Sequence, residues 1–409
     1  MEILFVHPNF PGQFRRFAAA LAREPEMRIH GVGDAKWMED TIPLPDIPVI
    51  AYPTLSATGN NIHPYARNFD AAVRRGQQIV QTLLAHKRQG LEPDLIIAHP
   101  GWGDAFYLKD IFPGAKVIGL FEYYYRVRGA DVGFDPEFPM NFDDIFRVHS
   151  LNATQLLALE SCDSGYCPTA WQRSCFPAHY QERLGVIHDG IDTAMVAPDA
   201  SAAITLPDGS THRAGEEILT FVSRSLEPYR GFHIFMRALP HILEARPHCQ
   251  VIIVGSDNVS YGKQPPPGQT YRQRYFDEIA DKIDQSRVHF TGRLPYNDYL
   301  KVLQISRAHV YLTYPFILSW SMLEAMSSGC LVIASATPTV QEVIIDGENG
   351  LLFPFDQPAT LANYAIEALS NPEQYRELRN TARQTVVSRY DFNTICYPAF
   401  KQLIKQFEW

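Results

Sequence analysis

The chain has 409 residues, which is more than a single hydrophobic core normally supports, so two domains are expected. Its 36 lysines and arginines stand against 45 aspartates and glutamates, which gives a net charge of -9 and a pI of about 5.9. This acidic balance argues against a broad binding surface for nucleic acid or for an anionic membrane.

Strand-like and helical patterns alternate through the first half of the chain. Strands are expected at residues 2–7, 93–99, 116–125 and 184–190. Helices are expected at residues 15–25, 65–88, 103–112, 150–162 and 171–176, and a long loop with several prolines separates the first two helices. This alternation predicts a parallel sheet with helices on both faces.

A polar stretch at residues 193–216, with the turn signal "PDGST", separates the two halves. The second half then repeats the alternation, with strands expected at 218–225, 250–256, 287–293, 309–314, 331–335 and 349–355. Helices are expected at 230–247, at 297–308 and around Glu324. We therefore predict an α/β fold with two doubly wound domains, residues 1–195 and 196–385, that face each other across a cleft.

The sequence also bears on the compartment in which the protein works. The longest uncharged stretch, residues 308–323, is shorter than the roughly 20 residues that a spanning helix needs. Residues 1–7 have no basic segment of the kind that precedes a cleaved secretory signal. The six cysteines show no C-x-x-C pair or zinc-like spacing, so we expect reduced thiols and a cytoplasmic protein.

One carboxylate, Glu324, interrupts the apolar run "TYPFILSWSMLEAMSSGCLVIAS" at residues 313–335. An ionised carboxylate is costly to bury without a partner. Ser321 and Glu324 fit a capping box, in which Ser321 caps a short helix that ends at Gly329. The alternative is that Glu324 accepts hydrogen bonds from a ligand rich in hydroxyl groups.

In open α/β sheets, ligands bind at the carboxyl ends of the strands, so residues just after each apolar run are site candidates. In the first half these are His7, Phe10, Gly12, Gln13, His99, Trp102, Glu122, Tyr123 and Tyr124. Gly12 either admits an anion to backbone amides at a helix start or simply forms a turn. Glu122 either works in the site, as a base or as a hydrogen-bond acceptor, or pairs with Arg126 or Arg128 to shape its loop.

In the second half, Arg224 lies at a strand end and Arg230 at a helix entrance. Two guanidinium groups beside a helix N-terminus form a suitable receptor for a diphosphate. Asp-x-Asp, a cluster with metal-ligand spacing, a Walker loop, a serine-hydrolase elbow and G-x-G-x-x-G are all absent from the sequence. We therefore expect no metal and no cofactor, with the arginines stabilising any leaving diphosphate.

Taken together, these segments resemble glycosyltransferase family 4, the retaining GT-B enzymes, over essentially the whole chain. The similar segments are "VIHDGIDT", "SRSLEPYRGF", "VIIVGSDNVSYG", "VHFTGRLPYNDYL" and "SWSMLEAMSSGCLVIAS" with "QEVIIDGENGLLF". The resemblance implies that a sugar nucleotide lies on the C-terminal domain and that an acceptor docks on the N-terminal one. It also implies that the last segment, residues 386–409, crosses back to pack on the first domain.

The resemblance further implies roles for individual residues. Arg224 and Arg230 would hold the diphosphate, Glu324 would bind the ribose hydroxyls, and the backbone at Gly292, Arg293 and Leu294 would hold the base. His99 and Glu122 are the catalytic candidates of the N-terminal domain. The remaining donor-side candidates are Gly12, Gly255, Phe316, Leu318, Ser319, Trp320 and Ser321, and the acceptor-side candidates are His7, Phe10, Gln13, Trp102, Tyr123 and Tyr124.

Three positions depart from the family pattern. Position 316 is Phe, where the family usually has a second glutamate that contacts the transferred sugar. The usual Arg and Lys phosphate pair is replaced by Arg224 and Arg230, with one extra residue between them. Glu122 stands at a strand end that often supplies a histidine facing the donor sugar.

The predicted function is transfer of a sugar from a nucleotide-diphosphate sugar to an acceptor hydroxyl, with retention and without a metal, in glycan or glycolipid biosynthesis. The acceptor would be a glycan, a lipid-linked molecule or a small molecule, and a lipid-linked one would bring the protein to the inner face of the membrane. Two alternatives are a sugar-nucleotide 2-epimerase of the same fold and a catalytically weak nucleotide-sugar-binding protein.

Overall fold

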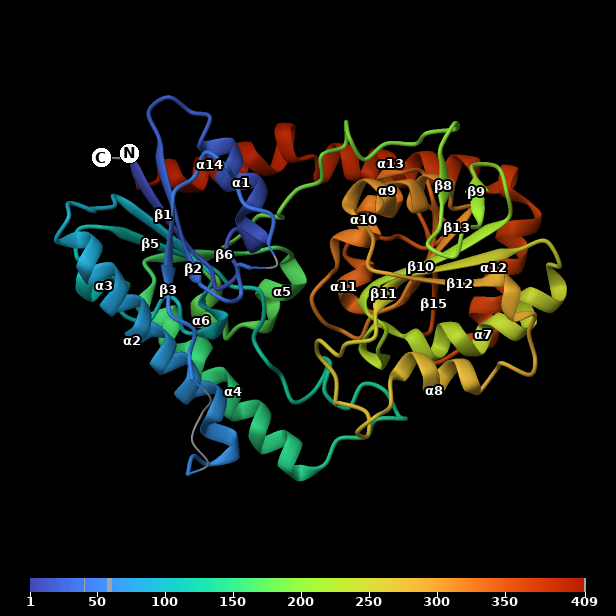
Figure 1. Cartoon of the computed structure of the whole chain (residues 1–409), viewed down its shortest axis with the longest axis horizontal. Helices are drawn as coiled ribbons and strands as arrows, with labels where there is room; N and C mark the ends of the chain where they lie inside the picture. The colour runs from blue at the N-terminus through green and yellow to red at the C-terminus, as the bar shows by residue number, and fades with distance from the viewer. Residues whose placement is uncertain (40, 57–60, 408–409) are drawn as a thin grey trace. The chain divides into compact units, whose positions relative to one another are not determined.

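The computed structural model describes residues 1–39, 41–56 and 61–407. The chain divides into two compact units, Met1–Gly190 with Phe392–Trp409, and Ile191–Asp391 (Figure 1). The first break lies five residues before the predicted boundary at 195, and the second lies six residues after the predicted boundary at 385. Among the described residues, no helix has both the length and the hydropathy to cross a bilayer.

The first unit is built on a seven-stranded parallel sheet in the order β3-β2-β1-β4-β5-β6-β7. The strands are β1 (Glu2–Val6), β2 (Arg28–Asp34), β3 (Val49–Tyr52), β4 (Leu95–Ala98), β5 (Lys116–Leu120), β6 (Ser164–Cys167) and β7 (Leu184–Val186). The α-helices are α1 (Arg15–Leu21), α2 (Arg67–Lys87), α3 (Leu108–Ile111), α4 (Phe142–Ser161), α5 (Ala170–Cys175), α6 (Ala178–Gln181) and α14 (Tyr397–Lys405). Short 3-10 turns, η1 (Gly12–Phe14), η2 (Pro64–Ala66) and η3 (Pro100–Trp102), and a π-helical turn at Phe392–Cys396 complete it.

Alternating residues of the central strands of this sheet feed two separate cores. Ile3 and Phe5 of β1 pack on one face with α1 and α14, and the rings of Phe17 and Phe400 stack there with centroids 4.0 Å apart. Leu4 and Val6 face the opposite core, which α2, α3 and α4 cover. The period of two along β1 therefore places helices on both faces, as predicted. The C-terminal helix α14 belongs to this unit, as the family resemblance implies.

The second unit has a six-stranded parallel sheet in the order β12-β11-β10-β13-β14-β15, together with a small antiparallel hairpin. The strands are β10 (Ile218–Ser225), β11 (Gln250–Ser256), β12 (Val288–Gly292), β13 (Ala308–Tyr311), β14 (Leu331–Ser335) and β15 (Leu351–Phe353), with β8 (Ala203–Thr205) and β9 (Thr211–Arg213) in the hairpin. The α-helices are α7 (Phe232–Ala245), α8 (Tyr271–Asp277), α9 (Tyr296–Ile305), α10 (Trp320–Ser327), α11 (Pro338–Gln341), α12 (Pro358–Ser370) and α13 (Arg376–Arg389). The 3-10 turns are η4 (Pro228–Arg230), η5 (Gln285–Arg287) and η6 (Pro372–Tyr375).

Three strands of the first sheet were not predicted, and each has a weak local signal. Strands β2 and β6 contain glycines, which pack poorly as strand residues. A Cβ at Gly31 would lie 2.4 Å from the ring of Phe10, and one at Gly165 would lie 2.5 Å from the ring of Phe121. Strand β3 has four residues inside the predicted loop. The expectation of one continuous loop before the second helix was therefore wrong.

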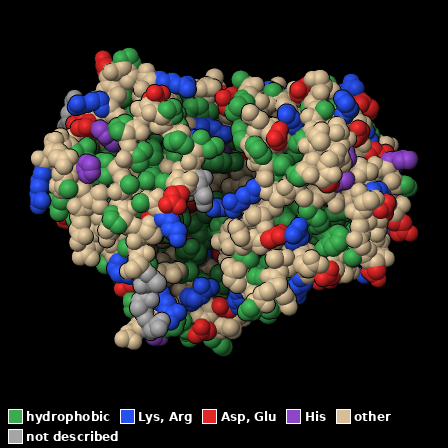
Figure 2. Space-filling view, in the orientation of Figure 1, with side chains coloured by type: hydrophobic (Ala, Val, Ile, Leu, Met, Phe, Trp, Pro, Cys, Tyr) green, Lys and Arg blue, Asp and Glu red, His purple; other side chains and the backbone are tan. Residues whose placement is uncertain are grey.

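The polar stretch that separates the two halves also contains structure that was not predicted. The turn "PDGST" closes the hairpin β8–β9, so this stretch is folded onto the second unit instead of being a plain linker. Ile204 and Leu206 of the hairpin are buried in a core with Ile218 and Ile252. On the face shown in Figure 2, acidic and basic side chains are interspersed over both units.

A glycine at the start of α7 fixes the backbone beside Arg230. Gly231 has a φ of +65°, which is a left-handed conformation, and an added Cβ would lie 2.3 Å from Cβ of Leu312. Gly268 offers a matched control, because its φ is +80° and no atom lies within 4 Å of the position of an added Cβ.

We therefore expect Gly231→Ala to lower the free energy of unfolding by roughly 3 kcal/mol or more, through backbone strain and steric overlap together. Gly268→Ala should lower it by about 1 kcal/mol, through strain alone. Guanidinium unfolding of both variants and the parent measures these differences. Equal losses in the two variants would show that contact with Leu312 contributes nothing.

Candidate functional site

The two arginines of the predicted diphosphate site stand on different sides of the turn that follows β10. Arg224 is the penultimate residue of β10 and is exposed. Arg230 ends the turn η4, directly before Gly231 and α7, and is 7% exposed. One arginine thus lies within the last two residues of a central strand and the other lies just after it, at the edge of the parallel sheet where ligands bind in open α/β folds.

The guanidinium of Arg230 is fixed by the protein. Its Nη1 donates to Oγ1 of Thr313 at 2.8 Å and to the carbonyl oxygen of Ile317 at 3.0 Å. The same group lies 5.2 Å from the ring centroid of Tyr261 and 5.9 Å from that of Phe316. Phe316, at the position of the family's second glutamate, therefore contributes an aromatic face beside this cation.

A buried glutamate that sequence reasoning missed holds the neighbouring loop. Glu227 is fully buried and accepts hydrogen bonds from the backbone amides of Ser260, Tyr261 and Gly262, at 2.9, 3.2 and 2.8 Å. Three amide donors compensate for much of the cost of burying this carboxylate. Glu227 thereby fixes the segment that carries Tyr261 against Arg230 and Phe316.

The capping-box reading of Ser321 and Glu324 is wrong. The helix α10 begins after Ser319, whose side-chain oxygen accepts from the amide of Ser321 at 3.4 Å. The hydroxyl of Ser321 lies 3.0 Å from that of Ser319. Glu324 is therefore in the second turn of the helix and not at the third position after the cap, so its carboxylate needs other partners.

The carboxylate of Glu324 is held by two tyrosines of α9. Its Oε1 accepts from the hydroxyl of Tyr296 and its Oε2 accepts from the hydroxyl of Tyr299, each at 2.7 Å. Glu324 is 3% exposed. Burial, followed by the nearby Glu324 carboxylate, raises the pKa of Tyr299 well above its ordinary value, so this phenol stays protonated and donates. These tyrosines supply the donors that the sequence pattern alone left unassigned.

The other donor-side candidates of the second unit lie near the carboxyl ends of its strands or in the segments that follow them. Gly292 ends β12 with a φ of +66°, and Arg293 and Leu294 lead from it into α9. Gly255 has no room for a side chain, because an added Cβ would lie 2.6 Å from the carbonyl oxygen of Ser223. Leu318 is buried, and Trp320 begins α10 partly buried.

In the first unit, a chain of hydrogen bonds converges on Glu122, which follows β5. Gln13 donates from Nε2 to Oε1 of Glu122 at 2.8 Å, and Nε2 of His99 lies 3.0 Å from Oε2. Nε2 of His7 lies 2.7 Å from Oε1 of Gln13. The side chain of Gln172 donates to the Glu122 backbone carbonyl at 2.6 Å. The structure thus brings together four of the predicted residues, from the ends of β1, β4 and β5.

Backbone amides determine which atoms donate and which accept in this chain of hydrogen bonds. The amide of Asn9 donates to Nδ1 of His7 at 3.2 Å, so a neutral His7 carries its proton on Nε2 and donates it to Gln13. Burial and the neighbouring His99 hold the pKa of His7 well below its usual range. The amide of Gly101 likewise donates to Nδ1 of His99, which leaves Nε2 to donate to Glu122. Glu122 is therefore positioned as a hydrogen-bond acceptor.

The remaining candidates of the first unit fall into exposed and buried sets. Trp102 is 37% exposed and stacks on His99, with centroids 4.6 Å apart. Phe10 is buried in the core, and Gly12 lies against the ring of His7, which an added Cβ would approach to 2.5 Å. This contact explains Gly12 as a packing position.

Two tyrosines and one arginine after Glu122 have structural partners. Tyr123 is 4% exposed and donates to Asp131 at 2.7 Å, and Tyr124 packs against Phe176. The side chain of Arg126 donates to the carbonyl oxygens of Ser174 and Cys175 at the end of α5. The loop is therefore anchored through Arg126 to α5, and an acceptor role for either tyrosine stays a prediction.

A buried polar cluster beside these residues was missed by the sequence analysis. Asp34, Arg75 and Asp104 are all less than a tenth exposed, and Oδ2 of Asp34, Nη1 of Arg75 and Oδ2 of Asp104 have no hydrogen-bond partner among the described residues. The guanidinium of Arg75 lies 4.5 Å from the ring centroid of Trp37. Burial raises the pKa of Asp104 to about 7, although Arg75 and His99 act in the opposite direction.

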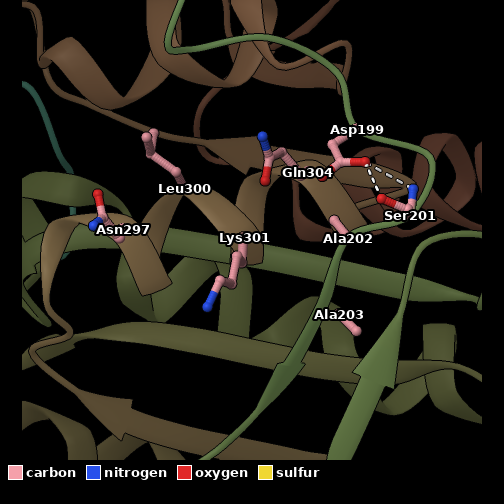
Figure 3. A pocket seen from close by; sticks show the side chains of 8 residues that line it. All are labelled: Asp199, Ser201, Ala202, Ala203, Asn297, Leu300, Lys301 and Gln304. Atoms are coloured by element: carbon pink, nitrogen blue, oxygen red, sulfur yellow. Dashed lines mark hydrogen bonds between the residues drawn. The ribbon is translucent and has the colours of Figure 1, made fainter.

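A pocket of about 400 Å³ lies elsewhere on the second unit, between the segment before β8 and one face of α9 (Figure 3). Asn297, Leu300, Lys301 and Gln304 line it from the helix, at the spacing of a single helical face. Tyr296 and Tyr299 project from a different face of α9 toward Glu324. None of the predicted site residues lines this pocket. Among described residues, no group of three His, Cys, Asp or Glu is arranged to hold a metal.

The raised pKa of Asp104 has a consequence for stability. The folded state retains a proton that the unfolded chain loses near pH 4, so this group makes folding less favourable as pH rises from about 4 to about 7. Asp104→Asn should remove that dependence and become more stable relative to the parent, by one to a few kcal/mol, as pH rises. Urea unfolding at several pH values tests this, with Asp110→Asn as an exposed control. A difference between variant and parent that does not vary with pH would contradict the assignment.

Two family models match this chain. Residues 29–196 match the model described as "Glycosyl transferase family 4 group", and residues 205–385 match "Glycosyl transferases group 1". Together they cover most of both structural units.

Curated relatives are similar to part of the chain. A phosphatidyl-myo-inositol mannosyltransferase of Mycobacterium tuberculosis is 28% identical over 218 residues, which is 51% of this chain and 50% of that protein. A D-inositol 3-phosphate glycosyltransferase of Corynebacterium efficiens is 25% identical over 208 residues, or 48% of this chain and 45% of that protein. The match thus spans about half the length of these relatives.

Solved structures resemble the chain over nearly its full length. A sucrose-phosphate synthase from Thermosynechococcus elongatus has a TM-score of 0.75 at 18% identity, with 99% of this chain and 98% of that chain covered. Anabaena HepE, solved in complex with UDP-glucose, has a TM-score of 0.69 at 17% identity, with 99% and 100% covered. These likenesses confirm the GT-B fold, and with the two family models they show that the chain belongs to the family 4, group 1 glycosyltransferases.

Proposed function

We propose that the protein transfers a sugar from a nucleotide-diphosphate sugar to an acceptor hydroxyl, with retention of anomeric configuration and without a metal. The observation that carries this proposal is the arrangement at the strand ends of the second unit. Arg224 lies near the end of the central strand β10, Arg230 follows that strand, and the buried carboxylate of Glu324 lies in the helix that follows β13. The cations for a diphosphate and the hydrogen-bond acceptor for ribose hydroxyls are therefore carried at or after the ends of strands of one sheet.

Each of these groups would bind a different part of the sugar-nucleotide donor. Arg230 is oriented by Thr313 and Ile317, so a phosphate oxygen would meet a guanidinium that has already lost its rotational freedom. Arg224 is exposed and would close on the phosphate from solvent. Glu324 would accept from the ribose, and the backbone after β12 would contact the base.

The chemistry needs positive charge where the diphosphate leaves. The bond between the anomeric carbon and the diphosphate oxygen breaks, and a bond from the acceptor oxygen to that carbon forms. The acceptor proton passes to an oxygen of the departing diphosphate, which becomes the free nucleoside diphosphate. Arg224 and Arg230 would stabilise the negative charge that develops on the leaving group.

The acceptor would bind to the first unit, where Glu122, His99, Gln13 and Trp102 supply polar groups and an exposed ring. The names of the similar mycobacterial and corynebacterial proteins specify phosphatidyl-myo-inositol and inositol phosphate. We therefore place polyhydroxylated rings, free or lipid-linked, first among acceptor classes, ahead of glycans. We place the reaction in the cytoplasm, with peripheral contact to the inner membrane face if the acceptor is lipid-linked.

The experiment incubates the purified protein with UDP-, GDP- and ADP-sugars, with and without inositol, inositol phosphate, phosphatidylinositol vesicles and oligosaccharides. We expect free nucleoside diphosphate to form in the presence of an acceptor, at a rate unaffected by EDTA, and an NMR spectrum that shows the donor's anomeric configuration in the product. A sugar nucleotide epimerised at C2, formed without any acceptor and without net release of nucleoside diphosphate, would instead favour the epimerase reading. Binding without turnover under all conditions would favour a nucleotide-sugar-binding protein.

Arg224→Ala is the matched test of the diphosphate role, because this side chain is exposed and its removal leaves the core intact. Turnover should fall by about a hundredfold, the scale on which one stabiliser of transition-state charge acts. Arg213→Ala, an exposed change on β9, should leave turnover unchanged. Equal activity in both variants would remove Arg224 from the site.

Glu122→Gln separates a base from a fixed hydrogen-bond acceptor. If Glu122, and not the departing diphosphate, takes the acceptor proton, glutamine cannot replace it. The variant should then bind donor normally, transfer sugar at least a hundredfold more slowly and lose the acidic limb of its pH profile. Steady-state kinetics across pH measure both effects.

The control for Glu122→Gln is Gln13→Ala, which removes one donor to Glu122 but keeps the carboxylate. It should lower the rate less and retain the acidic limb. If Glu122 only positions a hydroxyl, both variants should lose affinity for acceptor by similar factors and keep the shape of the pH profile. Normal kinetics in Glu122→Gln would exclude Glu122 from the site.

A further inference from the structure

The accessibility of Glu324 poses a problem for any ligand that is to bind it. Its side chain lies in a helix whose residues are almost all buried, and it is 3% exposed. Both carboxylate oxygens already accept a tyrosine hydroxyl at 2.7 Å. A ribose hydroxyl can therefore reach the carboxylate only if a group that now covers it moves.

The two tyrosines that hold Glu324 are not equivalent. Tyr299 packs against the core formed by α9, α10 and α13, and its hydroxyl is deeply buried. Tyr296 is 38% exposed and is the first residue of α9. It follows Pro295 and the segment Gly292–Leu294, which leads out of β12. The ring of Tyr296 lies 5.8 Å from that of Tyr299, centroid to centroid, but more than a third of Tyr296 is exposed, so its phenol can turn toward solvent. Tyr299 is packed against the core and lacks that freedom.

We propose that these tyrosines divide the control of Glu324 between them. Tyr299 is a positioning residue that holds Oε2 in both the empty and the occupied site. Tyr296 covers Oε1 in the empty site and gives way to a ribose hydroxyl when the nucleotide binds. This inference rests on the ribose role of Glu324 in the proposed function, and it makes Tyr296 and Tyr299 determinants of donor recognition.

The exchange keeps the carboxylate satisfied only for a suitable ligand. A ribose hydroxyl that replaces the phenol of Tyr296 restores one charge-assisted hydrogen bond, so the number of donors to Glu324 is unchanged. A ligand without ribose hydroxyls displaces the phenol but donates no hydrogen bond in its place, which leaves Oε1 of Glu324 buried without a donor. A site that demands a hydrogen bond in this way rejects an analogue that lacks the group.

Calorimetry first identifies which of UDP, GDP and ADP binds the parent most tightly. The affinities of that nucleoside diphosphate and of its 2′,3′-dideoxy form are then compared. The parent should bind the ribose form about tenfold more tightly than the dideoxy form. Tyr296→Phe removes the competing phenol, so it should bind the ribose form roughly threefold to tenfold more tightly and still discriminate against the dideoxy form.

Tyr299→Phe should show the opposite behaviour, because it frees the carboxylate to turn. We expect it to bind the ribose form about tenfold more weakly and to lose most of its discrimination between the two ligands. Tyr375→Phe, in η6 of the same unit, should match the parent. Thermal unfolding of each variant confirms that it is folded before its affinity is compared.

The outcomes separate this inference from the function on which it rests. Equal affinity of the parent for the ribose and dideoxy ligands would remove Glu324 from ribose recognition. It would overturn the ribose role of Glu324 and, with it, the exchange of Tyr296. A parent that discriminates, together with a Tyr296→Phe variant that binds the ribose form as weakly as Tyr299→Phe, would keep the ribose role and overturn the exchange. Unchanged affinity in Tyr296→Phe would also overturn it, because Tyr296 would then not compete with the ligand.

Discussion

The pairing of carboxylates withdrawn from water, fully at Glu227 and Glu324 and partly at Glu122, is the constraint on which the candidate sites depend. An ionised glutamate inside a protein must receive hydrogen bonds or it destabilises the fold by several kcal/mol. Glu227 receives three from backbone amides, Glu324 receives two from phenols, and Glu122 receives one from an amide and one from an imidazole. The kind of donor determines what each glutamate can do.

Backbone donors make Glu227 part of the scaffold. The amides of residues 260–262 cannot leave without unfolding their loop, so this carboxylate is committed to shaping it. The loop in turn presents Tyr261 to the guanidinium of Arg230, on which Phe316 also lies. A carboxylate at position 316 would attract that cation far more strongly than a phenyl ring does. With Phe there, the positive charge of Arg230 is better preserved for an anionic ligand.

An element of the fold could be predicted where its own residues carry the pattern, and not where the pattern depends on residues distant in the sequence. The strands at residues 2–6, 95–98 and 116–120 are apolar runs, which a local pattern reveals, and their ends correctly located His99 and Glu122 at one sheet edge. Strands β2 and β6 lack this signal because rings from Phe10 and Phe121 occupy the space where side chains would stand. A glycine in a strand looks like a break until its packing partner is known.

The candidate sites were predictable to a different degree. Arg230 and Glu324 stand out locally, as a cation beside a helix start and a carboxylate in an apolar run. The partners of Glu324 lie 25 and 28 residues away on α9, and Arg75 reaches its cluster from the middle of α2, so no local spacing connects them. The capping-box alternative for Ser321 fails because the helix begins two residues earlier than that pattern requires, with Ser319 as its cap.

The donors to Glu122 and Glu324 come from side chains, and side chains can be exchanged where solvent reaches them. At Glu122, the donor His99 is 3% exposed and lies beneath Trp102, so the carboxylate is presented in a fixed orientation. At Glu324, one donor, Tyr299, is packed against the core and the other, Tyr296, is more than a third exposed. A carboxylate held from one side by a fixed phenol keeps its direction while the other phenol changes place. Such a site keeps a buried charge satisfied when empty, and it still leaves that charge open to a ligand that supplies the same hydrogen bond.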